Sequence, residues 1–142
     1  MGSKAKVAVL GGGSFGTVIA NLIGGKGEAV NLWMRNAERA DDINRTRENS
    51  RYLPNHQLSD ILYATADLQQ AVVNAEIIFV SIPSQSFREV ISQAKHYIRP
   101  VQIVVSTTKG IEANTFSLMS QILADELPEN PIGVISGPNL AK

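Results

Sequence analysis

Near its amino terminus the chain reads Lys6-Val7-Ala8-Val9-Leu10-Gly11-Gly12-Gly13-Ser14-Phe15-Gly16, and this stretch decides the fold. The apolar run over residues 6–10 predicts a short buried strand that ends where the glycines begin. From Ser14 to about residue 23, apolar side chains recur with the spacing of one helix face. The sequence therefore predicts a strand that passes through a glycine-rich turn directly into a helix.

Residues 11–16 match the pattern G-x-G-x-x-G, which is typical of dinucleotide-binding turns. Gly11 permits the tight turn, Gly13 lets a pyrophosphate approach the backbone, and Gly16 lets the helix pack closely on the strand. The unpaired N–H groups at the start of the helix would then face the phosphates. A merely flexible glycine-rich turn is the alternative, and the strand and helix on either side argue against it.

Strands and helices alternate along the rest of the chain, which predicts a mainly parallel sheet with helices on both faces. The further strands are expected over residues 29–34, 61–65, 77–82, 102–106 and 132–135, and the further helices over residues 37–49, 67–74, 84–97 and 114–127. We therefore predict an α/β, doubly wound Rossmann-type domain over residues 1–142, with a ligand crevice outside the carboxyl ends of the strands.

The composition is that of a single globular domain of 142 residues, because 44% of them are apolar and 18% are charged. Thirteen basic and thirteen acidic residues balance, which argues against nucleic acid or a membrane surface as a partner. No cysteine is present, which excludes disulfides, thiolate nucleophiles and cysteine-based zinc sites. No apolar run reaches the length of a bilayer span. We expect a cytoplasmic protein with no signal peptide, no membrane insertion and no metal site.

The end of the second predicted strand bears on the choice of cofactor. An NAD site of this type places Asp or Glu there to bind the ribose 2′-hydroxyl, whereas this chain has Arg35 and no carboxylate before Glu38. A guanidinium at that position could pair with a 2′-phosphate. We therefore favour NADP(H) as the cofactor and keep NAD(H) as the alternative. The other arginines up to Arg51 alternate with acidic residues, so we expect most of them on a solvated helix face.

Two polar segments follow later predicted strands, at the edge where a ligand would lie. One is Thr108-Lys109-Gly110, and the other is Ser136-Gly137-Pro138-Asn139. A lysine in the first segment could bind a phosphate, polarise a carbonyl or contact the cofactor, and an exposed loop lysine is the alternative. The second segment offers backbone N–H groups and an amide, and an ordinary turn is its alternative.

Several separated motifs together resemble one family, the bacterial NAD(P)-dependent glycerol-3-phosphate dehydrogenases. The resemblance covers essentially the whole chain, in order. The motifs that carry it are Val9-Leu10-Gly11-Gly12-Gly13-Ser14-Phe15-Gly16-Thr17, Asn31-Leu32-Trp33 with Arg35, Tyr52-Leu53-Pro54, Val80-Ser81-Ile82-Pro83-Ser84, Ser106-Thr107-Thr108-Lys109-Gly110-Ile111-Glu112 and Ile135-Ser136-Gly137-Pro138.

This resemblance implies the interconversion of sn-glycerol 3-phosphate and dihydroxyacetone phosphate with NAD(P)(H), which feeds glycerophospholipid synthesis. It implies a chain that is only the cofactor-binding half of the enzyme. The family's helical C-terminal domain, which supplies the general acid/base lysine, is expected to be absent here. We therefore expect no general acid/base residue in this fragment, and we expect the fragment alone to be inactive.

The resemblance also assigns site residues beyond the glycines. By analogy with the family, the cofactor-binding residues are Ser14, Phe15, Arg35, Tyr52, Lys109 and Ala141. The substrate-binding residues are Lys109, Gly137 and Asn139. The family usually has Ser or Thr where Asn139 stands, and an amide can still donate a hydrogen bond.

Two other functions stay open. The chain could be the nucleotide half of a related 3-hydroxyacyl-CoA or 6-phosphogluconate dehydrogenase, although the Thr-Lys-Gly-Ile-Glu run favours the first interpretation. It could also be a non-catalytic dinucleotide sensor or scaffold, which would need the glycines but not Lys109. An isolated domain could expose apolar surface, which leaves a homodimer open.

Overall fold

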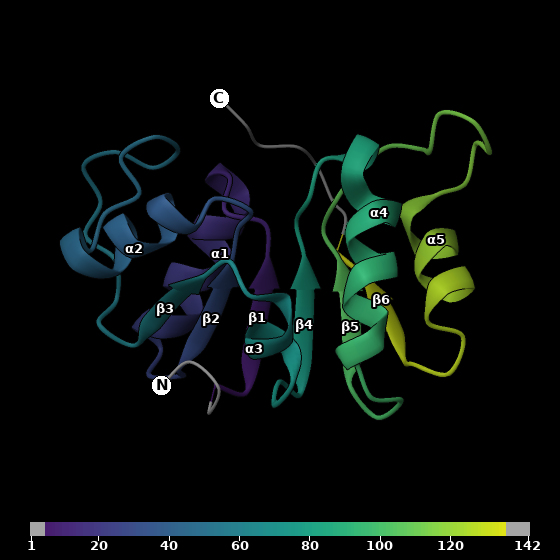
Figure 1. Cartoon of the computed structure of the whole chain (residues 1–142), viewed down its shortest axis with the longest axis horizontal. Coiled ribbons are helices and arrows are strands. Elements are labelled where there is room, and N and C mark those ends of the chain that lie inside the picture. Colours follow the sequence, from purple (N-terminus) through teal and green to yellow (C-terminus); the bar gives the residue numbers. More distant parts are fainter. Residues whose placement is uncertain (1–4, 136–142) are drawn as a thin grey trace.

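The computed structural model describes residues 5–135 and shows one six-stranded sheet between two layers of helices (Figure 1). The strand order is β3-β2-β1-β4-β5-β6, and every neighbouring pair is parallel. The predicted doubly wound α/β fold is confirmed. The elements are β1 (Val7–Leu10), α1 (Ser14–Gly25), β2 (Val30–Trp33), α2 (Ala37–Thr46), β3 (Leu62–Thr65), α3 (Leu68–Val72), β4 (Ile77–Val80), α4 (Ser84–Ala94), the 3-10 helix η2 (Lys95–Tyr97), β5 (Ile103–Ser106), α5 (Met119–Glu126) and β6 (Ile132–Val134).

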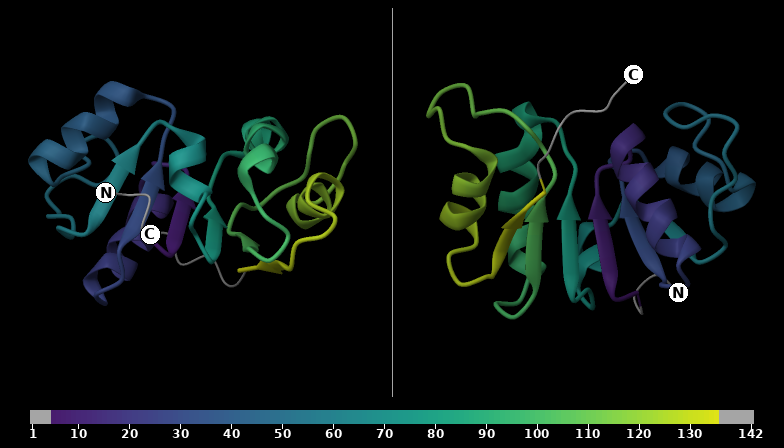
Figure 2. Two further views of the ribbon diagram at one scale, coloured as in Figure 1. Left: turned by 60° about the horizontal axis from the view of Figure 1, so that its bottom comes forward. Right: turned by 180° about the vertical axis from the view of Figure 1, so that it is seen from behind.

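The sheet is buried on both faces, which explains the near-continuous apolar runs of its central strands. Successive side chains of β1 enter different cores, since Leu10 joins the cluster with α3, α4 and α5 whereas Val9 joins the cluster with α1 and α2. Figure 2 shows these two helical layers on opposite sides of the strands. Trp33 is buried in the first cluster, as expected of a core residue. Across residues 5–135, no helix combines the length and the apolar character that a membrane span requires.

The predicted helix over residues 114–127 is wrong in its first turn, because α5 begins only at Met119. Phe116, which the predicted helix would have included, has a φ of 59° and is 73% exposed. The backbone instead forms a compact turn in which Phe116 N donates to Glu112 O and Glu112 N donates to Ser117 O. Phe116 and Met119 are three residues apart, a spacing typical of one helix face, but the residues before Met119 are not helical.

The other elements agree with the predictions except at their ends. The helix expected over residues 37–49 ends at Thr46, because Arg47 takes a left-handed conformation with a φ of 60°. Helix α1 continues through Gly24 and Gly25, beyond the predicted end at about residue 23. Asp67 caps α3 by accepting a hydrogen bond from Gln70 N.

The chain changes direction across the sheet at β1, and there backbone packs against backbone. Strand β1 lies between β2 and β4, so the connection that leaves β1 runs toward β2 whereas the connection that leaves β4 runs toward β5. A Cβ added to Gly16 would lie 1.9 Å from the carbonyl oxygen of Gly11. One added to Gly11, whose φ is +123°, would lie 2.0 Å from the carbonyl oxygen of Ser81. Only glycine allows these approaches, as the sequence predicted for both positions.

A charged cluster around Arg88 fastens the loop that follows β5. The Arg88 guanidinium donates to both carboxylate oxygens of Glu112, at 2.7 and 3.0 Å, and to Glu126 on α5 at 2.9 Å. This arrangement connects α4 to α5 and to the loop after β5, which contains Lys109 and Glu112. The hydrogen bond from Arg88 lowers the pKa of Glu112 below the ordinary range of a glutamate. The pKa of Glu126 is also lowered, first by the hydrogen bond from Lys95 and then by Arg88.

The glycine contacts predict a large difference between two alanine substitutions in the same helix. We expect Gly16→Ala to reduce the free energy of unfolding by about 1–3 kcal/mol or more, because the new Cβ overlaps a carbonyl that cannot move independently. Gly25→Ala, where a Cβ would meet nothing within 4 Å, should instead be neutral or stabilise by up to about 1 kcal/mol. Urea unfolding of both variants measures the difference, and equal stabilities would contradict it.

The Arg88 cluster predicts how stability depends on pH. Because the folded pKa values of Glu112 and Glu126 are lowered, their contribution is fully present above the pKa of an unfolded glutamate, about 4.3. It is lost as the pH falls through the lowered values. Arg88→Gln should therefore be less stable than the wild type at pH 7, and this gap should narrow below about pH 4. Thermal unfolding measures the gap, with Lys6→Gln in the exposed Lys6–Glu76 pair as the control. A gap that stays constant with pH would show that the carboxylates do not carry the effect.

Candidate functional site

A cavity of about 560 Å³ opens at the carboxyl ends of the central strands, where the crevice was predicted. Its walls come from the segments that follow β1, β2, β4 and β5, so residues far apart in sequence meet there. The described residues that line it are Gly11, Gly12, Gly13, Ser14, Phe15, Trp33, Met34, Arg35, Asn36, Arg39, Tyr52, Ser81, Ile82, Pro83, Thr107 and Thr108. They include two arginines and no carboxylate, so this lining favours an anionic ligand.

The glycine turn presents backbone donors to this cavity. No side chain in the described residues caps the start of α1, so the first N–H groups of the helix have no such acceptor. A Cβ added to Gly13 would meet nothing within 4 Å, although Gly13 lies in the cavity wall. The turn thus leaves open space beside unpaired donors, which is the geometry that holds a phosphate at a helix start.

Polar side chains fix the carbonyls of the same turn. Thr17 Oγ1 donates to Gly13 O at 2.7 Å, and the buried Asn49 donates through Nδ2 to Gly12 O at 3.0 Å and to Thr17 Oγ1 at 2.9 Å. The Ser14 hydroxyl donates to Tyr52 O at 2.8 Å, so it joins the loop after α2 to the glycine turn. The family resemblance assigns Ser14 and Tyr52 to the cofactor. Nothing in the sequence pointed to Asn49, because one Asn in a polar segment carries no distinguishing pattern.

Arg35 lies after β2, as its position in the sequence predicted, and it lines the cavity. Its guanidinium Nη2 lies 3.1 Å from Glu89 Oε1 on α4, and both side chains are more than half exposed. An exposed pair of this kind contributes less than about 1 kcal/mol, so a ligand could exchange for it. In the described structure, nevertheless, the positive charge of Arg35 is partly neutralised.

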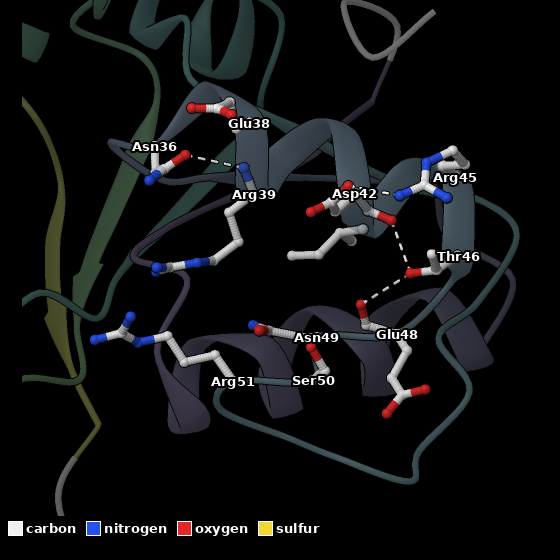
Figure 3. A pocket seen from close by; sticks show the side chains of 11 residues that line it. Asn36, Glu38, Arg39, Asp42, Arg45, Thr46, Glu48, Asn49, Ser50 and Arg51 are labelled. Carbon is white, nitrogen blue, oxygen red and sulfur yellow. Dashed lines mark hydrogen bonds and ion pairs between the residues drawn. The ribbon is translucent and has the colours of Figure 1, made fainter.

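Two of the other arginines, most of which were predicted on a solvated helix face, lie together at Tyr52. The guanidinium carbon of Arg39 lies 5.6 Å from the centre of the Tyr52 ring, and that of Arg51 lies 5.3 Å from it. A second cavity of about 380 Å³ lies between α2 and the loop that follows (Figure 3), and it shares Asn36 and Arg39 with the larger one. Sequence spacing alone could not predict that Arg39 and Arg51 lie together, because the loop after α2 must fold back to bring Arg51 close to the helix.

The ends of β4 and β5 are joined by threonine side chains at the other side of the large cavity. Thr107 Oγ1 donates to Val80 O at 3.1 Å, and Thr108 Oγ1 accepts from Ile82 N at 3.0 Å and donates to Ile82 O at 2.7 Å. Lys109 comes directly after this pair of threonines and is exposed. It is not among the lining residues, although Thr107 and Thr108 before it are. Its predicted contact with cofactor and substrate stays a prediction.

The remaining predicted site residues have different outcomes. Phe15 lines the cavity and is 55% exposed, so its ring is available to a ligand. Gly137, Asn139 and Ala141 lie outside the described residues, and their assignments stay predictions.

Comparison with known proteins places this site in a family. Residues 6–142 match the family described as "NAD-dependent glycerol-3-phosphate dehydrogenase N-terminus". The chain is 56% identical to a glycerol-3-phosphate dehydrogenase [NAD(P)+] of Acinetobacter baumannii over 137 residues, which are 96% of this chain and 38% of that protein. It is 54% identical over its full length to the protein of the same name from Saccharophagus degradans, of which it covers 40%.

A solved structure agrees with these sequence matches. The glycerol-3-phosphate dehydrogenase of Coxiella burnetii superposes with a TM-score of 0.89 at 36% identity, over 97% of this chain and 42% of that one. The chain thus spans about two fifths of the length of the relatives it matches. With the glycine turn, the strand order and these matches in agreement, the chain belongs to the family of NAD-dependent glycerol-3-phosphate dehydrogenases, of which it represents the N-terminal part.

Proposed function

We propose that the chain binds NAD(P)(H) and acts as the cofactor-binding half of a glycerol-3-phosphate dehydrogenase. The single observation that carries the proposal is the uncapped start of α1 beside the open space at Gly13, in a cavity lined by arginines and no described carboxylate. The residues present fit a dinucleotide, because backbone donors face the place of a pyrophosphate and cations lie at the end of β2.

The substrate pair is sn-glycerol 3-phosphate and dihydroxyacetone phosphate, in line with the names of the relatives. The nicotinamide supplies the hydride chemistry when it is bound, and the protein binds and orients the reactants. The proposed role of Lys109 is to stabilise negative charge on the ketone oxygen, since an ammonium group beside β5 would lie near it. Gly137 and Asn139 are the proposed substrate-binding residues.

The group that exchanges a proton with the substrate is proposed to be a lysine in the part of the relatives that this chain does not span. In that case the 142-residue chain binds cofactor and turns over poorly or not at all. The proposed place of the whole enzyme is the cytoplasm, where it supplies glycerol phosphate for phospholipid synthesis.

Gly13→Ala tests the proposal without disturbing the fold. Gly13 has extended backbone dihedrals, a φ of −75° and a ψ of −168°, and its added Cβ would meet nothing in the chain. The free energy of unfolding should therefore change by less than about 1 kcal/mol. The same Cβ would obstruct a pyrophosphate, so we expect the Kd for NADH and NADPH to rise at least about tenfold.

Calorimetric titration of the wild type, Gly13→Ala and the control Gly25→Ala with both cofactors measures this effect. The proposal requires that Gly25→Ala bind like the wild type. A wild-type chain that binds neither cofactor, or a Gly13→Ala variant that binds both as tightly as the wild type, would refute it.

A further inference from the structure

The arginines between Arg35 and Arg51 fall into two groups when their partners are compared. Three of them are engaged: Arg35 pairs with Glu89, Arg45 pairs with Asp42 at 2.7 Å, and Arg47 donates to the carbonyls of Ser59 and Leu62. Across the described residues, Arg39 and Arg51 have no carboxylate within 4.0 Å of a guanidinium nitrogen. Both guanidinium groups instead lie over the Tyr52 ring.

These two uncompensated cations are held near each other by separate elements. Arg39 extends from the first turns of α2 and Arg51 from the loop beyond it, and Figure 3 shows both side chains directed toward the same end of the smaller cavity. Arg45 and its partner Asp42 lie at the other end. Contact with one aromatic ring restrains both guanidinium groups and leaves their N–H donors for another acceptor.

The position of the pair suits one part of a dinucleotide. In this fold the ribose of the adenosine lies at the end of the second strand, which is β2 here. Arg39 lines both cavities and Tyr52 lines the larger one, so the pair stands where the larger cavity passes from the end of β2 into the smaller one. Two cations without a counter-ion at that place favour a dianionic group rather than a neutral hydroxyl.

We propose that Arg39 and Arg51 together bind the 2′-phosphate of NADP(H) and are the main determinants of preference for it, an inference that rests on the proposed cofactor function. Arg35 has the smaller part, because it must release Glu89 to reach the phosphate and the Glu89 carboxylate would repel the same group. The guanidinium forks bond phosphate oxygens directly, whereas the adenosine ribose of NADH offers them only hydroxyls.

Charge-removing variants test the proposal through the ratio of two affinities. The Kd values of the chain for NADPH and NADH are measured by calorimetry for Arg39→Gln, Arg51→Gln, the double variant and Arg35→Gln. Loss of one charge-assisted contact should raise the Kd for NADPH about tenfold in each of the first two and about 100-fold in the double variant. The Kd for NADH should change less than about twofold, and Arg35→Gln should affect NADPH less than either.

Arg45→Gln is the matched control, because it removes one positive charge from the same helix at a residue already neutralised by Asp42. It should leave both affinities unchanged, and thermal unfolding of each variant verifies that the chain is folded. The inference is overturned if Arg39→Gln and Arg51→Gln weaken NADH and NADPH equally or weaken neither. It is also overturned if Arg35→Gln alone abolishes the preference.

A second pair of probes separates this inference from the proposed function. The nucleotide 2′,5′-ADP carries the 2′-phosphate, and 5′-AMP is the same molecule without it. A chain that binds 2′,5′-ADP at least about tenfold more tightly than 5′-AMP, with that gain lost in the double variant, supports the inference even if no dinucleotide binds. Equal affinity of the wild-type chain for the two nucleotides overturns it, even if both dinucleotides bind.

Discussion

The close approach of backbone to backbone at the end of β1 is the constraint on which the rest of the structure depends. Gly16 must lie against the carbonyl of Gly11, and Gly11 against the carbonyl of Ser81, for α1 to start where it does. These two contacts bring the start of a helix to the place where the connections of the sheet diverge. Any side chain there would push α1 away from β1 and β4, and the donors of the helix would no longer face the cavity.

Charged and polar side chains position the two sides of the large cavity. The described wall of the large cavity carries Arg35 and Arg39 without a carboxylate, whereas the carboxylates of Glu112 and Glu126 lie around Arg88. Asn49 and Thr17 hold the carbonyls of the glycine turn, so its donors are left toward the ligand. The Arg88 cluster acts at the other side, where it fixes the loop that carries Lys109. The proposed adenosine end and the proposed reacting end are thus positioned by different interactions.

Local sequence predicted those features that depend on local physics. The glycine turn, the order of strands and helices and the position of Arg35 all follow from residues that are close in sequence. The grouping of Arg39 and Arg51 at Tyr52 does not, because it requires a loop to fold back over α2. Phe116 misled the helix prediction, since its spacing is helical while its φ of 59° and its exposure belong to a turn. Asn49 could be recognised only from the folded structure, in which it donates to the carbonyl of Gly12 and the hydroxyl of Thr17.

The central claim is that the start of α1 holds the pyrophosphate, and amide NMR of the labelled chain during titration with NADPH tests it most directly. The account predicts that the largest shifts fall on the N–H groups of residues 13–16, with smaller ones at Arg35 and Tyr52. The amides of η2, at the opposite end of α4 from its start beside the cavity, should not move. Saturable shifts centred elsewhere, with residues 13–16 unchanged, would contradict the account.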